Sequence, residues 1–142
     1  MMGFALSQRT SSVTVNTAIW EIRAGYRDAY ITEIGITQTA ATGAAYGVGR
    51  PQVSGISPTA PQTFVSDDDV NSTSTTQGAV AWGTGPTQPA SFSRRMTTTN
   101  AIGAGVIWTF PRALECPGGG GSVVIWATAT PVACDVWAHV LE

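Results

Sequence analysis

Apolar and polar positions alternate along several short stretches of this chain, and the clearest case lies at residues 104–111. There, Val106, Trp108 and Phe110 fall on one side of an extended strand, and the residues between them fall on the other, because strand side chains alternate between two faces. Three large apolar side chains on one face need cover from the rest of the chain. The pattern therefore predicts a two-faced strand that packs against other strands.

Further segments of the same kind are predicted to form short strands, separated by glycine- and proline-rich turns. They are residues 15–24, 30–39, 44–50, 62–66, 78–82, 92–98, 122–130 and 135–141. No stretch shows an apolar period of 3.6 over the length of a helix. The sequence therefore predicts an all-β fold, an antiparallel β-sandwich that is jelly-roll-like with about eight or nine short strands. A barrel and an immunoglobulin-like topology stay open, although the Cys–Trp–Cys arrangement of antibody domains is missing.

The length of 142 residues is most simply that of one domain. Residues 1–13 show neither periodicity, so we expect an N-terminal arm there and a single β-sandwich domain over residues 14–142. Phe4 and Leu6 are apolar residues in this otherwise polar arm. Either they pack on a partner or they belong to a frayed terminus.

Charged residues make up only 11% of the chain, and all seven basic residues are arginine. A surface with so few charges favours association, although a compositional bias of the gene would also remove lysine. The net charge of −2 provides no basic field for nucleic acid. We also expect no membrane segment, since no apolar run approaches the roughly 20 residues that a span needs, and no secretory signal at the N-terminus.

The two cysteines, Cys116 and Cys134, are expected to be free thiols. The strand assignment places them near opposite ends of one strand. At about 3.3 Å per residue this separates them by more than 20 Å, whereas a disulfide needs Cα atoms within about 7 Å. Free thiols are compatible with synthesis in a reducing cytoplasm.

Candidate catalytic groups are sparse, and we predict that the chain is not an enzyme and holds no cofactor. The one histidine, His139, lies on the same face of the last predicted strand as Trp137 and is interpreted as a packed or interface residue. A Cys–His nucleophilic pair would need a thiol within hydrogen-bond reach of it. A pair of carboxylates of the glycosidase type depends on three-dimensional separation. Glu21, Glu33 and Asp135 lie in or beside predicted strands, and Glu21 and Glu33 are more simply outward-facing edge or interface charges.

One stretch is a weak candidate for a metal site. Asp67, Asp69 and Asn71 alternate as the start of a calcium loop does, but the glycine and glutamate that such a loop needs further on are replaced by Ser72 and Gly78. The stretch 67–76 is therefore expected to be a solvated acidic loop.

Tryptophan and arginine supply the candidate contact residues. The chain has five tryptophans, which are expected to lie mostly in the core or in subunit contacts, although exposed tryptophans can stack on sugars. Arg94 and Arg95 are adjacent and so face opposite ways on a strand, which requires one of them to be paired or to lie at an interface. With Phe4, Leu6 and Arg50, they are the predicted partner-binding residues.

Several blocks of the chain resemble a group of small virion proteins of tailed bacteriophages, and the resemblance extends over about residues 15–142. The blocks are residues 18–25 (AIWEIRAG), 34–36 (IGI), 46–51 (YGVGRP), 82–86 (WGTGP) and 106–112 (VIWTFPR). These are structural blocks rather than catalytic motifs. The resemblance implies a β-sandwich protein that coats or cements a capsid, commonly as a trimer over a symmetry axis of the shell.

Two functions are therefore expected. The first is a capsid decoration or cement protein on the virion surface, made in the host bacterial cytoplasm, with the major capsid protein and further copies of itself as partners. The N-terminal arm and the loops 52–61 and 67–76 are its candidate capsid contacts. The alternative is a carbohydrate- or receptor-binding module of a phage tail or fibre, which requires an exposed tryptophan with polar neighbours.

Overall fold

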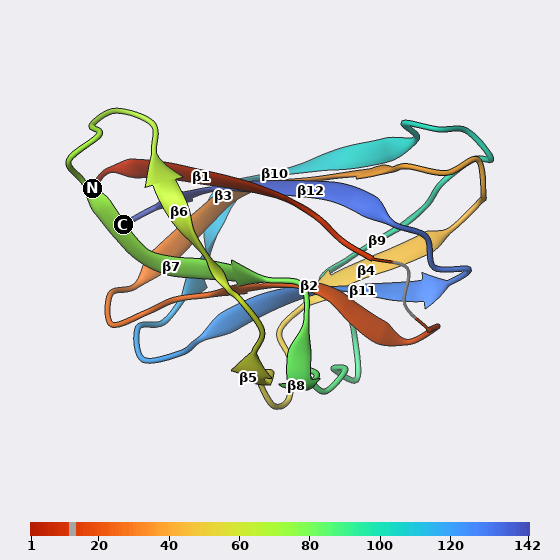
Figure 1. The fold of residues 1–142 in the computed structure, drawn as a ribbon, viewed down its shortest axis with the longest axis horizontal. Helices are drawn as coiled ribbons and strands as arrows, with labels where there is room; N and C mark the ends of the chain where they lie inside the picture. Colours follow the sequence, from red (N-terminus) through yellow and green to blue (C-terminus); the bar gives the residue numbers. More distant parts are fainter. Residues whose placement is uncertain (12–13) are drawn as a thin grey trace.

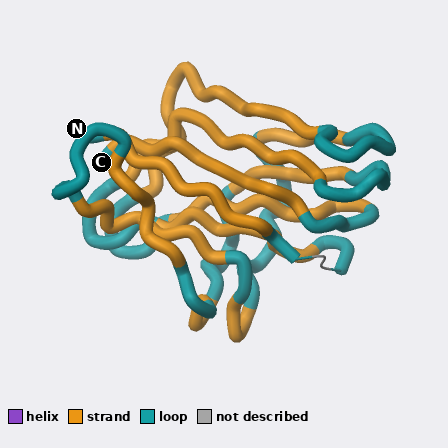
Figure 2. The backbone as a smooth tube through the Cα atoms, turned by 45° about the horizontal axis from the view of Figure 1, so that its top comes forward, coloured by secondary structure: helices purple, strands orange, loops and turns teal. Residues whose placement is uncertain are grey.

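The computed structural model describes residues 1–11 and 14–142 and contains twelve strands and no helix within them. The strands are β1 Gly3–Arg9, β2 Thr17–Arg23, β3 Ala29–Gln38, β4 Ala45–Gly49, β5 Ile56–Pro58, β6 Gln62–Ser66, β7 Thr73–Ala79, β8 Trp82–Thr84, β9 Arg94–Thr97, β10 Gly105–Cys116, β11 Ser122–Ala129 and β12 Cys134–Leu141. Short loops and turns join them (Figure 2). The predicted all-β class is confirmed, with more strands than expected.

Ten of the strands form one antiparallel sheet in the order β10-β3-β12-β1-β6-β7-β2-β11-β4-β9. The sheet folds over, so that β10, β3, β12 and β1 form one layer above a second layer that contains β2, β11 and β4 (Figure 1). β5 and β8 form a separate two-stranded ladder below the second layer. The sheet is nearly closed, and β9 and β10 are its two edge strands.

The hydrophobic core lies between the two layers and draws large side chains from both. Ile34 and Val136 contribute from the first layer, and Trp20 and Ile125 from the second; all are at most 1% exposed. In β12 the burial alternates along the strand, which is the period of two expected for a strand with one covered face. The core is therefore formed by the covered faces of strands whose other face points outward, as the sequence predicts.

Strand β10 confirms the predicted faces at its start and extends beyond the predicted end. Trp108 and Phe110 are buried, whereas Ile107 is 54% exposed. The sequence places the strand end at Pro111, but pairing with β3 resumes at Leu114 after an irregular stretch. Proline is accommodated there because a bulged edge strand does not need its N–H for the ladder.

The N-terminal segment is a strand of the sheet, and the prediction of an arm is wrong for residues 3–9. β1 pairs with β12 from Gly3 to Arg9 and with β6 at Phe4 and Ala5. Phe4 is 2% exposed and Leu6 is 7% exposed, both within the chain's own core. They therefore cannot serve as partner contacts in this fold. The remainder of the predicted arm includes residues 12–13, which lie outside the described residues.

Two predicted loops also contain strands. The stretch 52–61 contains β5, and the stretch 67–76 contains the start of β7 at Thr73. The first of these loops, together with β8, covers part of the outer face of β2 and β11. There, Trp126 is fully buried against the ring of Phe92, with the centroids 5.7 Å apart. A second, smaller apolar cluster therefore lies outside the sheet.

Both cysteines are free, as predicted, and both are buried. Their placement on one strand is wrong, since Cys116 ends β10 and Cys134 begins β12. Both strands pair with β3, where Cys116 lies opposite Ala29 and Cys134 lies opposite Gln38. The thiols therefore lie at opposite ends of β3, too far apart for a disulfide.

Candidate interaction surfaces

A tryptophan ring lies flat on the outer face of the first layer. Trp137 in β12, Gly35 in β3 and Ile107 in β10 are consecutive partners across the three strands. A Cβ atom built on Gly35 would lie 1.9 Å from Cζ2 of Trp137. The ring therefore occupies the space that a side chain on β3 would take, which only glycine leaves free.

Polar groups surround this ring. The Trp137 indole Nε1 donates a hydrogen bond of 3.2 Å to a carboxylate oxygen of Glu33. Ser7 on β1 lies opposite Trp137 on the other side. We call the surface formed by Ser7, Glu33, Ile107 and Trp137 the Trp137 face. It combines an aromatic ring and an exposed isoleucine with a carboxylate and a hydroxyl on a flat support.

His139 lies two residues beyond Trp137 on the same face of β12, and its ring contacts the side chains of Thr32 and Asp67. Its Nδ1 is 2.8 Å from the hydroxyl of Thr32, and its Nε2 is 3.0 Å from a carboxylate oxygen of Asp67. The Thr32 hydroxyl also donates to the backbone carbonyl of His139 over 3.2 Å. This hydroxyl–imidazole–carboxylate row links the β6–β7 loop to β12 and β3. Neither thiol belongs to it, because Cys134 lies on the opposite, buried face of β12 and Cys116 lies at the end of β10.

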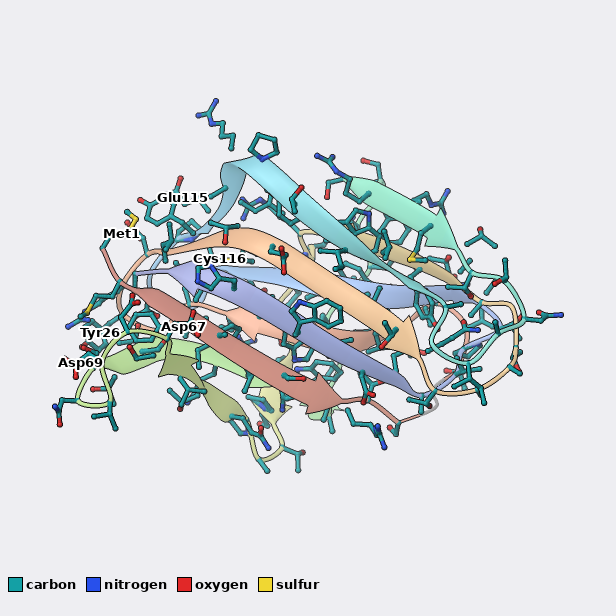
Figure 3. The ribbon with its side chains drawn as sticks, turned by 90° about the horizontal axis from the view of Figure 1, so that it is seen from above. Met1, Tyr26, Asp67, Asp69, Glu115 and Cys116 are labelled. Carbon is teal, nitrogen blue, oxygen red and sulfur yellow. The ribbon has the colours of Figure 1, made fainter. Side chains whose placement is uncertain are left out.

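The calcium-loop candidate is not assembled in the structure. Asp69 accepts hydrogen bonds from the backbone N–H of Asn71 and from the hydroxyl of Ser72, which makes it a turn-stabilising residue. Asp67 contacts His139 instead. Within residues 1–11 and 14–142, no group of three or more His, Cys, Asp or Glu side chains is arranged to hold a metal ion. Figure 3 shows Asp67 and Asp69 at the same corner of the molecule, beside β1 and β6.

A cleft of about 300 Å³ opens near the unpaired edge of the sandwich. It is lined by Gly49, Arg50, Ser91, Phe92, Ser93, Leu114 and Val123, which we call the arginine cleft. Arg50, which follows β4, donates to the backbone carbonyl of Glu115 over 2.5 Å. Phe92 lies over Gly47 of β4, where an added Cβ would be 2.7 Å from the ring. The cleft therefore has an aromatic wall, two hydroxyls and a guanidinium.

The two other predicted contact arginines lie beside this cleft. The Arg94 guanidinium is 5.6 Å from the ring centre of Phe110, and that of Arg95 is 5.1 Å from the ring centre of Phe92. The two adjacent side chains thus contact different rings, which fits the opposite directions expected for neighbouring residues of a strand. None of Arg50, Arg94 and Arg95 forms an ion pair in the described part of the chain. The fold thus places Arg94 and Arg95 on the strand beside β4, next to the cleft that Arg50 lines.

One carboxylate lies where the sequence does not place it. The sequence predicts an outward-facing Glu21, but this side chain is 1% exposed. Its two oxygens accept hydrogen bonds from Trp82 Nε1 (2.7 Å), from the backbone N–H of Gly55 (3.2 Å) and from Arg23 (3.2 Å). Arg23 also donates to the backbone carbonyl of Gly55. This buried network attaches the β5–β8 ladder to β2, because a buried carboxylate requires such partners.

The outward-facing prediction suits Glu33 better, and Asp135, for which the sequence predicts no direction, also lies at the surface. Glu33 is partly buried on the Trp137 face. Asp135 forms a bidentate pair with Arg9, at 2.7 and 2.9 Å. The hydrogen bonds from Arg9 lower the pKa of Asp135 from its ordinary value. The pair connects β1 and β12 at the surface.

Comparison with protein-family models, with curated proteins and with solved structures finds no match to this chain in any of the three. Among residues 1–11 and 14–142, no helix has the length and apolar character that crossing a lipid bilayer demands. The functional interpretation of the candidate surfaces therefore depends on their geometry alone.

Proposed function

We propose that this chain is a virion structural protein of a tailed bacteriophage, of the capsid decoration or cement type. It binds the outer surface of the capsid, through contacts with the major capsid protein, and stabilises the shell as a homo-oligomer, with three copies as the expected number. Its action is mechanical, since a small protein that bridges neighbouring capsomers resists the outward pressure of packaged DNA. It is made in the host bacterial cytoplasm and functions on the virion.

The Trp137 face carries this proposal. Tryptophan is enriched at the centres of protein interfaces, because it removes a large area from water and keeps one polar group to orient the contact. Here the ring of Trp137 is held in place on Gly35, so little conformational entropy is lost on binding. Ile107, 54% exposed, extends the apolar area on the same face.

Two features of the sequence support the same function. The chain has only 11% charged residues, and a surface with so few charges loses little solvation when it is covered. The blocks that resemble small phage virion proteins include 106–112, which contributes Ile107 to the Trp137 face. A stable contact of this kind buries roughly 1,200–2,000 Å² in total.

The test compares binding of the wild-type protein and the Trp137→Ala variant to undecorated capsids of the phage that encodes the chain. We expect the wild-type protein to sediment with capsids in a saturable manner, and Trp137→Ala to bind at least about tenfold more weakly, as for a truncated interface hot spot. The matched control is Tyr26→Ala, which removes an aromatic side chain that is 75% exposed in another part of the surface. Equal binding by Trp137→Ala and wild type would overturn the assignment of this face. A handful of copies per purified virion, rather than a number in proportion to the capsid subunits, would overturn the function.

A specific observation also favours the alternative, a carbohydrate- or receptor-binding module of a phage tail or fibre. The Trp137 ring lies against the sheet at Gly35, and the Glu33 carboxylate lies at its edge. A sugar ring can pack its C–H face on such an indole while its hydroxyls donate to the carboxylate. Binding of the isolated protein to a glycan array, lost in both Trp137→Ala and Glu33→Gln, would favour this function over capsid attachment.

A further inference from the structure

The arginine cleft contains the guanidinium of Arg50, which forms no ion pair within residues 1–11 and 14–142. Arg50 lines it, and Arg94 and Arg95 lie on the adjoining strand β9, without a carboxylate partner in the described residues. Arg50 binds the backbone carbonyl of Glu115 and not its carboxylate. The lining residues include no acidic side chain. The cleft therefore suits an occupant that combines an anionic group with an apolar one.

The β6–β7 loop has this combination. Val70 is 96% exposed, the highest exposure among the large apolar side chains of the described chain. Three aspartates precede it, of which Asp67 is paired with His139 and Asp69 stabilises its own turn. The carboxylate of Asp68 forms no ion pair within residues 1–11 and 14–142. The loop thus presents an acidic residue and an apolar residue, two positions apart, on a supported turn.

The loop and the cleft lie on different sides of the molecule. Figure 3 shows Asp67 and Asp69 beyond β1 and β6, on the far side of the sheet from β9 and β10. The same loop cannot fill the cleft of its own chain. It can, however, reach the cleft of a second copy, since both features are exposed.

We propose that copies of this chain associate head to tail, with the β6–β7 loop of one copy seated in the arginine cleft of the next. Val70 packs against Phe92 and Leu114 in the cleft, and Asp68 pairs with the guanidinium of Arg50. The contact joins two different patches, so it forms a closed ring where the rotation between copies closes. This inference rests on the proposed function only for the number of three copies; the contact itself is independent of any capsid.

Charge reversal with complementation tests the contact. The oligomeric state of the full chain is measured by sedimentation velocity over a range of concentrations. We expect Asp68→Arg and Arg50→Asp each to weaken association at least about tenfold, and Val70→Ser to do the same, because each removes one element of the contact.

A mixture of Asp68→Arg and Arg50→Asp should associate again. The reversed loop of the first variant then meets the reversed cleft of the second, and the unchanged loop of the second meets the unchanged cleft of the first. Opposite charges are thus restored at every contact between unlike variants, whereas contacts between like variants stay repulsive. A closed ring of three copies still contains one contact between like variants, so the mixture should restore two of its three contacts, whereas the Asp68→Arg/Arg50→Asp double variant should restore all three.

Matched controls separate this result from a general effect of charge or hydrophobicity. Arg27→Asp reverses an exposed arginine at the β2–β3 turn, and Val53→Ser truncates a valine that is 55% exposed; both should associate as the wild type does. Circular dichroism melts verify that each variant is folded. If Arg50→Asp fails to fold, Arg50→Glu replaces it in the mixture, because it reverses the same charge with a longer side chain.

Two results would overturn the proposal. One is a wild-type chain that stays monomeric at high concentration, which would leave the cleft for an acidic segment of another protein. The other is an oligomer that Val70→Ser and both charge reversals leave intact. Failure of the proposed function would appear differently, as normal head-to-tail association by a protein that does not bind capsids.

Discussion

The ring of Trp137 lies directly on the backbone of Gly35, and each of the two residues makes the other's position possible. A Cβ atom on Gly35 would lie within 1.9–2.3 Å of three ring atoms. The Gly35→Ala substitution should therefore displace the indole and destabilise the protein by about 1–3 kcal/mol, as overpacking does. Denaturant unfolding measures this change.

A double-mutant cycle controls this prediction. In a Trp137→Ala background, Gly35→Ala should cost little, because the clash has been removed. Gly85→Ala is a matched control, since an added Cβ there meets nothing within 4 Å. An equal cost of Gly35→Ala in both backgrounds would show that the ring does not constrain this glycine.

Because the carboxylate of Glu21 is buried, its removal should lower the free energy of unfolding substantially. Glu21→Ala would leave the indole N–H of Trp82 without its acceptor and Arg23 without its charged partner. We expect a loss of about 3 kcal/mol, because removing one member of a buried pair leaves the other uncompensated. Urea unfolding measures it, and Glu33→Ala, at a partly exposed carboxylate, serves as the comparison. A loss no larger than that of Glu33→Ala would contradict the network.

The cysteines should be unreactive in the folded protein. Burial raises the pKa of the Cys116 thiol to about 12. Burial also raises the pKa of Cys134, although hydrogen bonding with Tyr46 opposes this. Because the thiolate is the reactive species, a disulfide reagent at pH 8 should label neither cysteine in native protein and both after unfolding. The Tyr26→Cys variant provides an exposed thiol as a positive control; rapid native labelling of the wild type would contradict the buried placement.

The Glu142 side chain should make stability depend on acid pH. Burial raises its pKa, but this is outweighed by hydrogen bonds from Thr76, Thr75 and Ser74, so that the pKa falls below its ordinary value of 4.5. A group with a lowered folded-state pKa stabilises the fold above its unfolded pKa, and this contribution is lost as the pH falls through the folded-state pKa. Unfolding free energies measured from pH 6 down to pH 3 should therefore decrease, with a smaller decrease in Glu142→Gln.

Asp135 provides the comparison for this pH dependence. Its pKa is also lowered, by hydrogen bonding with Arg9, so the Glu142→Gln variant should retain part of the acid-dependent loss. The double variant with Asp135→Asn should retain less. Identical pH profiles for wild type and Glu142→Gln would show that the contacts of Glu142 with β7 do not favour its ionised form.

Local patterns are sufficient to predict the all-β class and most strands. The alternation at 104–111 correctly places Trp108 and Phe110 inside and Ile107 outside. The reason is that strand side chains alternate by geometry, so a short run of residues already reports which face is covered. The same argument places Trp137 and His139 on one face of the last strand.

Contacts between segments that lie far apart in the sequence cannot be predicted from these local patterns. The burial of Phe4 depends on pairing between β1 and β12, from opposite ends of the chain. The burial of Glu21 depends on the β5–β8 ladder, which covers the outer face of β2. The arginine cleft and the Thr32–His139–Asp67 row likewise join residues from separate strands and loops. Periodicity reports the two faces of a strand, whereas the elements that cover each face, and the charges that meet there, follow from long-range pairing of the folded chain.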